Sequence, residues 1–362
     1  MPWVVRDAVD EINRAVGRRW QGLDPFLPPR AELPDGCAAP FVTSGSNGRP
    51  AGLAVCRHEY VAAATLNQTW GMAGRFSLIV RLREADTSAA LDDLLGQWRG
   101  HLAGLPEAAA GDPAAMISWP SRDVTGVNAL LRHGLQALTV IAVRSGPAAA
   151  GPAPGLGFTT VADPTVADTN IADPNVADPT VADTAAGAAL PAANGAGAAG
   201  LAIREAGPQD LDVVTELELG VIRYDALFGA AIVRPATEAL VRAETQAALA
   251  VRPAWAWLAE RDGRPVGLLH VQPPGPSGWI AGMARGGATA YLQTMFVQPG
   301  ERGAGIGAAL VRHAHAVLDA RGVQTTLLHY AQLNPLSAPF WNRMGYRPLW
   351  TGWEVRPATA LR

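Results

Sequence analysis

The sequence predicts an α/β protein made of two halves that a long low-complexity segment joins. Three observations indicate this class. Short apolar runs alternate with helically spaced segments in both halves, an Asp-Gly pair at 262–263 lies between two apolar runs, and a five-residue repeat separates the halves. The 362 residues exceed one typical domain, and a content of 49% hydrophobic residues can fill two cores.

The N-terminal half, residues 1–145, begins with a segment whose apolar residues have the spacing of an amphipathic helix. Residues 3–20 form this helix, and a Gly-containing turn then joins the hairpin strands 39–43 and 51–56. The later runs predict a strand, a helix, a strand, a helix and a closing strand, at 76–82, 88–102, 116–119, 124–133 and 138–144.

The segment 146–200 interrupts this pattern with a repeat of the type Val-Ala-Asp-Pro-Thr. A pentapeptide solenoid would need several coils and large apolar residues inside each coil. Here Pro164, Pro174 and Pro179 remove backbone donors, and the flanking sequence is rich in Ala, Gly and Pro. We therefore predict an acidic, extended and disordered linker with partial polyproline II character.

The C-terminal half, residues 201–362, also alternates strand-like and helix-like segments. Strands are predicted at 201–205, 255–260, 265–271, 291–297 and 325–330, and helices at 211–222 and 237–250. The segment 272–289 is rich in Gly and Pro, which predicts an irregular, mobile excursion before the strand at 291.

A glycine-rich turn follows the strand 291–297 and precedes a helix. Its residues are Arg302, Gly303, Ala304, Gly305, Ile306 and Gly307. Unpaired NH groups and partial positive charge at a helix start favour an anion, and glycines let a bulky oxyanion approach the backbone. The turn therefore predicts a diphosphate site, with an ordinary Gly-rich turn as the alternative. The chain has no lysine for a P-loop, and the glycine spacing does not fit a dinucleotide-binding fold.

Two motifs together resemble the GNAT superfamily of acyl-CoA-dependent N-acyltransferases. The stretch from Val297 through Arg302 to Gly307 is similar to the family's pyrophosphate loop. The segment from Asn334 through Trp341 to Tyr346 is similar to its later helix, which ends at a glycine. The resemblance covers about residues 201–356. It implies a mixed, mostly antiparallel sheet flanked by helices.

The N-terminal half repeats the order of elements that the resemblance implies for the C-terminal half. Its strand-to-helix joint has no glycine and carries Glu84 and Asp86 instead. We interpret this half as a degenerate GNAT-like domain, and an unrelated α/β domain is the open alternative.

The resemblance also implies a donor and the residues that hold it. Acetyl-CoA would place its pyrophosphate on residues 302–307 and its pantetheine arm along the backbone of Phe296 and Val297. Asn334 would face the pantetheine or the thiol end, and it is also placed to cap a helix before Pro335. The amine acceptor would attack the thioester directly in a ternary complex, and no metal is expected.

The proton path is left open, because two family positions differ in this sequence. Trp341 occupies a position that often holds a tyrosine acid, and Tyr291 lies near a position that often holds a glutamate base. Tyr291, Tyr330 and His270 are the candidate catalytic residues, and each has packing or structure as an alternative role. Late aromatic residues, at 340, 341, 346, 350 and 353, fit either an acceptor pocket or a core.

Charge and composition exclude several classes of partner. A net charge of −3 gives no field for nucleic acid or anionic lipid. Cys37 and Cys56 have the spacing of neither a disulfide framework nor a zinc site. The acidic residues near the N-terminus and the lack of a long apolar run predict a soluble, cytoplasmic protein. The two functions left open are an N-acetyltransferase for a small-molecule or peptide amine and a non-catalytic acyl-CoA-binding or interaction protein.

Overall fold

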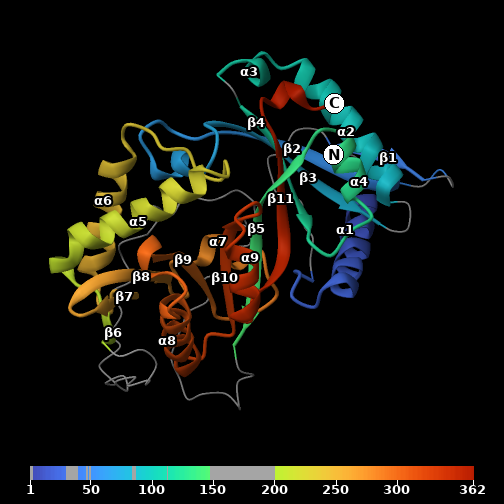
Figure 1. The fold of residues 1–362 in the computed structure, drawn as a ribbon. Helices are drawn as coiled ribbons and strands as arrows, with labels where there is room; N and C mark the ends of the chain where they lie inside the picture. Colours follow the sequence, from blue (N-terminus) through green and yellow to red (C-terminus); the bar gives the residue numbers. More distant parts are fainter. Residues whose placement is uncertain are drawn as a thin grey trace.

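The computed structural model describes residues 3–29, 40–45, 48, 50–83, 87–111, 113–146 and 200–362. Helices flank a single mixed sheet of eleven strands in the order β1-β2-β3-β4-β11-β5-β10-β9-β8-β7-β6 (Figure 1). This arrangement confirms the predicted mixed α/β class, with the strands of the two halves joined into one sheet. The predicted linker at 147–199 and the joint at Glu84 and Asp86 lie outside the described residues.

The predicted helices and strands are present, with small differences at their ends. The N-terminal half contributes α1 (Trp3–Leu23), β1 (Phe41–Ser44), β2 (Pro50–Tyr60), η1 (Leu66–Trp70), β3 (Gly74–Leu82), α2 (Thr87–Ala103), α3 (Pro106–Ala109), β4 (Ala114–Pro120), α4 (Val127–Arg132) and β5 (Gln136–Ser145). The C-terminal half contributes β6 (Leu201–Glu205), η2 (Pro208–Asp210), α5 (Leu211–Ala226), α6 (Thr237–Ala250), β7 (Ala256–Arg261), β8 (Arg264–Gln272), α7 (Gly278–Ala281), β9 (Thr289–Val297), η3 (Pro299–Glu301), α8 (Ile306–Ala320), β10 (Thr325–Ala331), α9 (Ser337–Arg343), β11 (Arg347–Val355) and η4 (Ala358–Ala360).

The two halves have the same order of elements around a parallel strand pair. In the N-terminal half α2 connects β3 to its parallel neighbour β4, and in the C-terminal half α8 connects β9 to β10. A helix crossover is the connection that parallel neighbours require. A short helix and a last strand follow in each half, α4 and β5 or α9 and β11. This repeat confirms the predicted tandem organisation.

The last strand of each half lies between strands of the other half. β5 pairs with β10 and β11, and β11 pairs with β4 and β5, all in antiparallel register (Figure 1). The green β5 therefore lies between two strands of the C-terminal half, and the red β11 lies between two strands of the N-terminal half. The centre of the sheet consequently has no exposed edge, and hydrogen bonds between the two halves hold it together.

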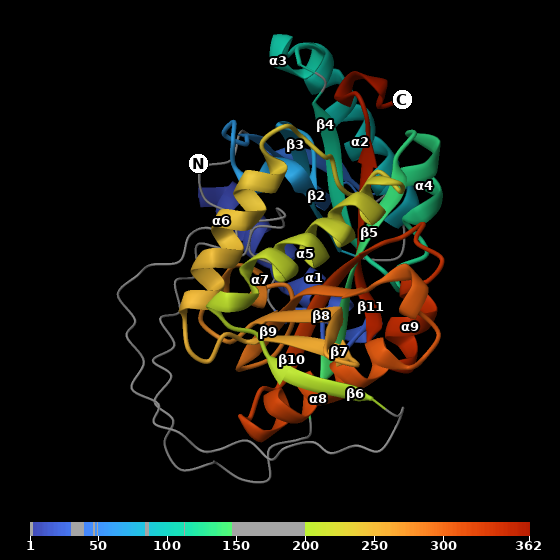
Figure 2. The same cartoon turned by 60° about the vertical axis from the view of Figure 1, so that its left-hand side comes forward.

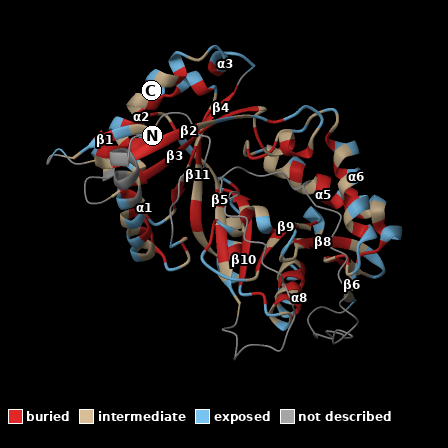
Figure 3. Ribbon diagram, turned by 180° about the vertical axis from the view of Figure 1, so that it is seen from behind, coloured by how far each residue is buried: buried red, intermediate tan, exposed pale blue. Residues whose placement is uncertain are grey.

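Helices cover both faces of the sheet because its strands alternate their apolar side chains. On β7, Ala256 and Leu258 belong to the core under α5, whereas Trp257 and Ala259 belong to the core under α8. α5 and α6 lie together on one side of the C-terminal strands (Figure 2). Strands between the helix layers are largely buried (Figure 3). No helix in the described part of the chain is both long and apolar enough to cross a membrane.

The Gly- and Pro-rich segment after β8 is packed, although its composition predicts an irregular excursion. It contains the short helix α7, and the side chains of Ile280 and Met283 are buried in a core with residues of α1. The indole nitrogen of Trp350 donates a hydrogen bond to the carbonyl oxygen of Met283 at 2.7 Å. The segment therefore holds Trp279 in a fixed position beside β9.

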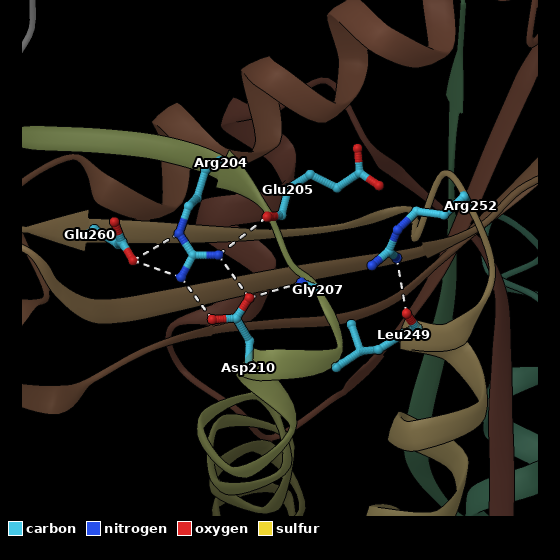
Figure 4. A network of polar contacts seen from close by, with 7 residues as sticks. All are labelled: Arg204, Glu205, Gly207, Asp210, Leu249, Arg252 and Glu260. Atoms are coloured by element: carbon cyan, nitrogen blue, oxygen red, sulfur yellow. Dashed lines mark hydrogen bonds and ion pairs between the residues drawn. The ribbon is translucent and has the colours of Figure 1, made fainter. Parts of the chain in front are cut away.

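A charged network fixes the outer edge of the sheet to the start of α5 (Figure 4). The guanidinium of Arg204 on β6 donates two hydrogen bonds of 2.7 Å to the carboxylate of Asp210 and one of 2.9 Å to Glu260 on β7. Asp210 also accepts the backbone NH of Gly207 at 2.8 Å. These bonds hold the pKa of Asp210 below its usual value, chiefly through Arg204.

Candidate active site

The site begins where two parallel strands stop pairing. β9 and β10 are paired only from Thr289 and Thr325 to Leu292 and Leu328. Beyond this point β10 continues its pairing with β5, while β9 continues with β8 as far as Val297. The two strands therefore diverge, and a cavity of about 640 Å³ opens between them. Cavities of this size hold small molecules.

The glycine-rich turn forms one end of this cavity. Gly303 and Gly305 have φ values of 83° and 80°, a left-handed conformation that favours glycine, and Gly305 is the N-cap of α8. A Cβ atom at Gly305 would meet no neighbouring atom within 4 Å, so the space beside it is open. The first NH groups of α8 and the glycines are therefore accessible at the end of the cavity, and such groups favour an anion.

Arg302 is anchored beside the turn rather than extended into solvent. Its Nε donates a hydrogen bond to the carbonyl oxygen of Val297 at 3.1 Å. Its guanidinium carbon lies 4.8 Å from the ring centroid of Tyr224 and 5.5 Å from that of Phe296. These contacts hold the positive charge at the mouth of the turn.

The residues predicted to bind the donor are brought together, with one exception. Of these, the residues that line the cavity are Phe296, Val297, Arg302, Gly303, Gly305, Ile306, Gly307 and Asn334. Ala304 is exposed on the outside of the turn and is not among the lining residues. Asn334 is buried, and its Oδ1 accepts the backbone NH of Leu336 at 3.0 Å, which fixes the turn before α9.

A β-bulge fixes a polar side chain halfway along the cavity. The pairing of β8 with β9 shifts register between His270 and Val271, which leaves Gln293 without a partner residue on β8. The amide of Gln293 donates to Glu244 on α6 at 3.1 Å and accepts from Gln272 at 3.0 Å. The side chain therefore has a fixed orientation.

Asp225, near the end of α5, is a cavity carboxylate that sequence analysis missed. Burial raises the pKa of Asp225 to about 6, while a hydrogen bond with the side chain of Asn334 opposes this shift. A carboxylate with this pKa is largely ionised at neutral pH and accepts a proton readily. Glu218 lies seven residues earlier on the same face of α5 and also lines the cavity. The seven-residue spacing of these two carboxylates was the sequence signal that they lie on one helix face.

The three predicted catalytic candidates have different positions. Tyr291 and Tyr330 line the cavity. His270 is buried, and its Nδ1 lies 3.1 Å from Oε1 of Glu218, whose other oxygen accepts the hydroxyl of Thr245 at 3.1 Å. His270 thus contacts the cavity through Glu218.

Tyr291 belongs to an aromatic group at the inner end of the cavity. Its hydroxyl lies 3.1 Å from Nδ1 of His329, and its ring meets that of Trp279 edge-on at 5.0 Å. Burial lowers the pKa of His329 to about 4, so this imidazole is neutral at physiological pH. Burial, with a smaller effect of the charge of Asp225, raises the pKa of Tyr291, so the phenol keeps its proton.

The N-terminal half contributes to the same cavity. Leu66 and Trp70 of η1 and Thr139 of β5 line it. Of the late aromatic residues, Phe340 and Trp341 line the cavity, and the buried residues Trp341, Tyr346, Trp350 and Trp353 belong to hydrophobic cores. In the described residues, no group of three or more His, Cys, Asp or Glu is placed to hold a metal ion.

One family match lies within the C-terminal half of the chain. Residues 230–346 match the family described as acetyltransferase (GNAT) family. The chain resembles the crystal structure of a GCN5-related N-acetyltransferase from Sphaerobacter thermophilus with 15% identity and a TM-score of 0.47, over 94% of this chain and 84% of that one. No curated protein matches the sequence.

Two further solved structures are similar to this chain. A tandem GNAT protein from the clavulanic acid biosynthesis pathway has 13% identity and a TM-score of 0.40, over 94% of this chain and 87% of that one. A GCN5-related N-acetyltransferase from Ralstonia eutropha JMP134 has 25% identity and a TM-score of 0.31, over 41% of this chain and 94% of that one.

Proposed function

We propose that this protein, whose residues 230–346 match the acetyltransferase (GNAT) family, transfers an acetyl group from acetyl-CoA to a primary amine of a small molecule or peptide. The observation that carries the proposal is a continuous cavity that joins the glycine-rich turn to the carboxylate of Asp225, whose pKa is raised. One end suits a pyrophosphate, and the other suits an ammonium group.

The donor would lie along the wedge between β9 and β10. Residues 302–307 would hold the pyrophosphate with backbone NH groups and the charge of Arg302. The backbone of Phe296 and Val297 would hydrogen-bond the pantetheine arm, and Asn334 would face the thiol end. This binding would fix the thioester beside Gln293 and Tyr291 and thereby position it for attack.

The reaction would proceed by direct attack in a ternary complex. Asp225 takes one proton from the acceptor ammonium, and the free amine attacks the thioester carbonyl carbon. The carbon–sulfur bond then breaks, and the second proton of the amine nitrogen goes to the departing thiolate. Tyr291, which keeps its phenol proton, is the hydrogen-bond donor for the developing oxyanion.

A pair of nearly isosteric variants tests donor binding. Gly305→Asp and Gly305→Asn place side chains of the same shape at a left-handed position that both tolerate, and only the aspartate is charged. We expect calorimetric affinity for acetyl-CoA to fall by roughly tenfold more in the aspartate variant, because its charge would face the pyrophosphate. Gly322→Asp, at a left-handed position after α8, is the control and should bind normally.

Thiol release over a panel of amines then separates catalysis from binding. Release with any amine supports an acetyltransferase. Acetyl-CoA binding without release would favour the alternative, a non-catalytic acyl-CoA-binding protein. The observation that supports this alternative is Trp341, which stands in place of a tyrosine acid. Absence of acetyl-CoA binding by the wild type would overturn both functions. The cytoplasmic location and the absence of nucleic-acid and membrane partners stay predictions from the sequence.

A further inference from the structure

We propose that the acceptor is a primary amine with one positive charge on an apolar, preferably aromatic, body, and that the N-terminal half contributes Trp70 to the wall that selects it. This inference rests on the proposed acetyltransferase function and adds its substrate class. It follows from the charges, the rings and the occupied hydrogen bonds at the inner end of the cavity.

The charges at the inner end favour a single cation. The arginines that line the cavity, Arg302 and Arg343, lie at the glycine-rich turn and at the end of α9, which is the donor side. Asp225 and Glu218 line the cavity with their carboxylates, the charge of Asp225 acts on Tyr291, and His329 beside Tyr291 is neutral at physiological pH. These two carboxylates attract an ammonium group. A carboxylate on the acceptor would lose its hydration and would be repelled by the same two negative charges.

Glu218 is poorly placed to bind a second ammonium group. Both of its carboxylate oxygens already take part in hydrogen bonds, with His270 and Thr245, and its side chain is buried. Asp225 shares a side-chain hydrogen bond with Asn334 and is consequently the less occupied carboxylate for the acceptor. This arrangement favours a monoamine over a polyamine.

The remaining inner wall favours an apolar body. Its rings are Trp70, Trp279 and Tyr291. Three polar side chains of this wall are already paired with one another, since the Trp279 indole donates to Gln272 at 2.8 Å and Gln272 donates to Gln293 at 3.0 Å. Polar groups that are already paired offer few hydrogen bonds to a polyhydroxylated acceptor such as an amino sugar.

Trp70 is held rigidly although it belongs to the other half of the chain. The carbonyl oxygen of Thr69 accepts the backbone NH of Ile232 at 2.7 Å. The guanidinium of Arg234 donates to the carbonyl oxygens of Gln68 at 2.9 Å and Gly71 at 3.2 Å. These bonds tie η1 to the segment between α5 and α6. The wall is therefore a fixed part of the acceptor pocket.

A matched substrate pair tests the proposed class. Phenethylamine and phenylalanine differ only by a carboxylate, so kcat/KM should be higher for phenethylamine by roughly a hundredfold. Hexylamine should also react, and putrescine and glucosamine should be poor acceptors. A preference for phenylalanine, putrescine or glucosamine would overturn the proposed class while leaving the acetyltransferase function intact. Absence of thiol release with every amine, despite acetyl-CoA binding, would overturn both.

Variants of the wall test the role of the N-terminal half. Trp70→Ala should lower kcat/KM for phenethylamine by roughly tenfold, through lost apolar contact, while the Kd for acetyl-CoA stays unchanged. Trp70→Leu keeps apolar bulk and is the second variant if the alanine protein does not fold. Tyr60→Ala, at a side chain that is 73% exposed on the same half, is the control. An unchanged kcat/KM in both Trp70 variants would remove η1 from the acceptor site.

Discussion

We expect Asp225 to be the residue that accepts the proton in the proposed reaction. Its pKa of about 6 means that it loses its base form as the pH falls through 6. Asp225→Asn keeps the shape and removes the base, so kcat should fall by roughly a hundredfold and the acidic limb of the wild-type rate profile should disappear. Steady-state thiol release from pH 5 to pH 9 measures both effects. Asp212→Asn, on the same helix but exposed, should behave as the wild type.

The same substitution should stabilise the fold, because a raised carboxyl pKa means that burial of the charge opposes folding. The sign follows from proton binding. The native state binds a proton more tightly than the unfolded state, so this group destabilises the protein progressively from pH 4 to pH 6 and fully above pH 6. Asp225→Asn should therefore raise the free energy of unfolding by up to about 3 kcal/mol at pH 7.5 and by little at pH 4. Urea unfolding at both pH values measures it, and equal effects would refute the assignment.

Sequence patterns predicted most of the residues at the glycine-rich end of the cavity but missed Asp225 and Trp70, for a physical reason. Residues 302–307 act through local backbone geometry, and glycine records that geometry in the sequence. Asp225 and Trp70 acquire their roles only when α5 and η1 meet across the two halves. The spacing of Glu218 and Asp225 predicts that both lie on one face of the helix. The sequence does not show which other elements that face contacts.

At the scale of elements, η1 depends on hydrogen bonds from the C-terminal half. Arg234→Met removes the donors to the carbonyl oxygens of Gln68 and Gly71 and keeps most of the aliphatic stem. We expect a loss of about 1–3 kcal/mol in the free energy of unfolding and a higher KM for the acceptor, with the same affinity for acetyl-CoA. Arg223→Met, at an exposed ion pair with Glu216, should change neither quantity. A raised Kd for acetyl-CoA would contradict this local role.

The elements themselves were predictable, whereas their partners in the sheet were not. The run at 138–144 predicts the strand β5 because its residues have the apolar and β-branched composition of a buried strand. This composition does not show on which side of β11 the strand lies. Contacts between residues far apart in sequence decide the pairing. The exchange of β5 and β11 is therefore visible only in the tertiary structure.

At the scale of the whole molecule, the exchanged strands should make each half depend on the other. Residues 200–362 alone would leave β10 and β11 without β5, and residues 1–146 alone would leave β4 and β5 without β11. We expect each piece to aggregate when expressed alone, and the two to form a soluble, active complex when co-expressed. Size-exclusion chromatography with thiol release measures this outcome. A soluble, active 200–362 fragment would show that the exchange is dispensable.

The pairing of β4 with β11 also sets an order of events during synthesis. Pro120 pairs with Trp350 and Ala115 with Val355, so β4 leaves the ribosome long before its neighbour has been translated. During that interval one edge of the N-terminal strands has no native partner from this chain. β11 completes the centre of the sheet, so the N-terminal half can reach its final structure only after residues 347–355 have been synthesised.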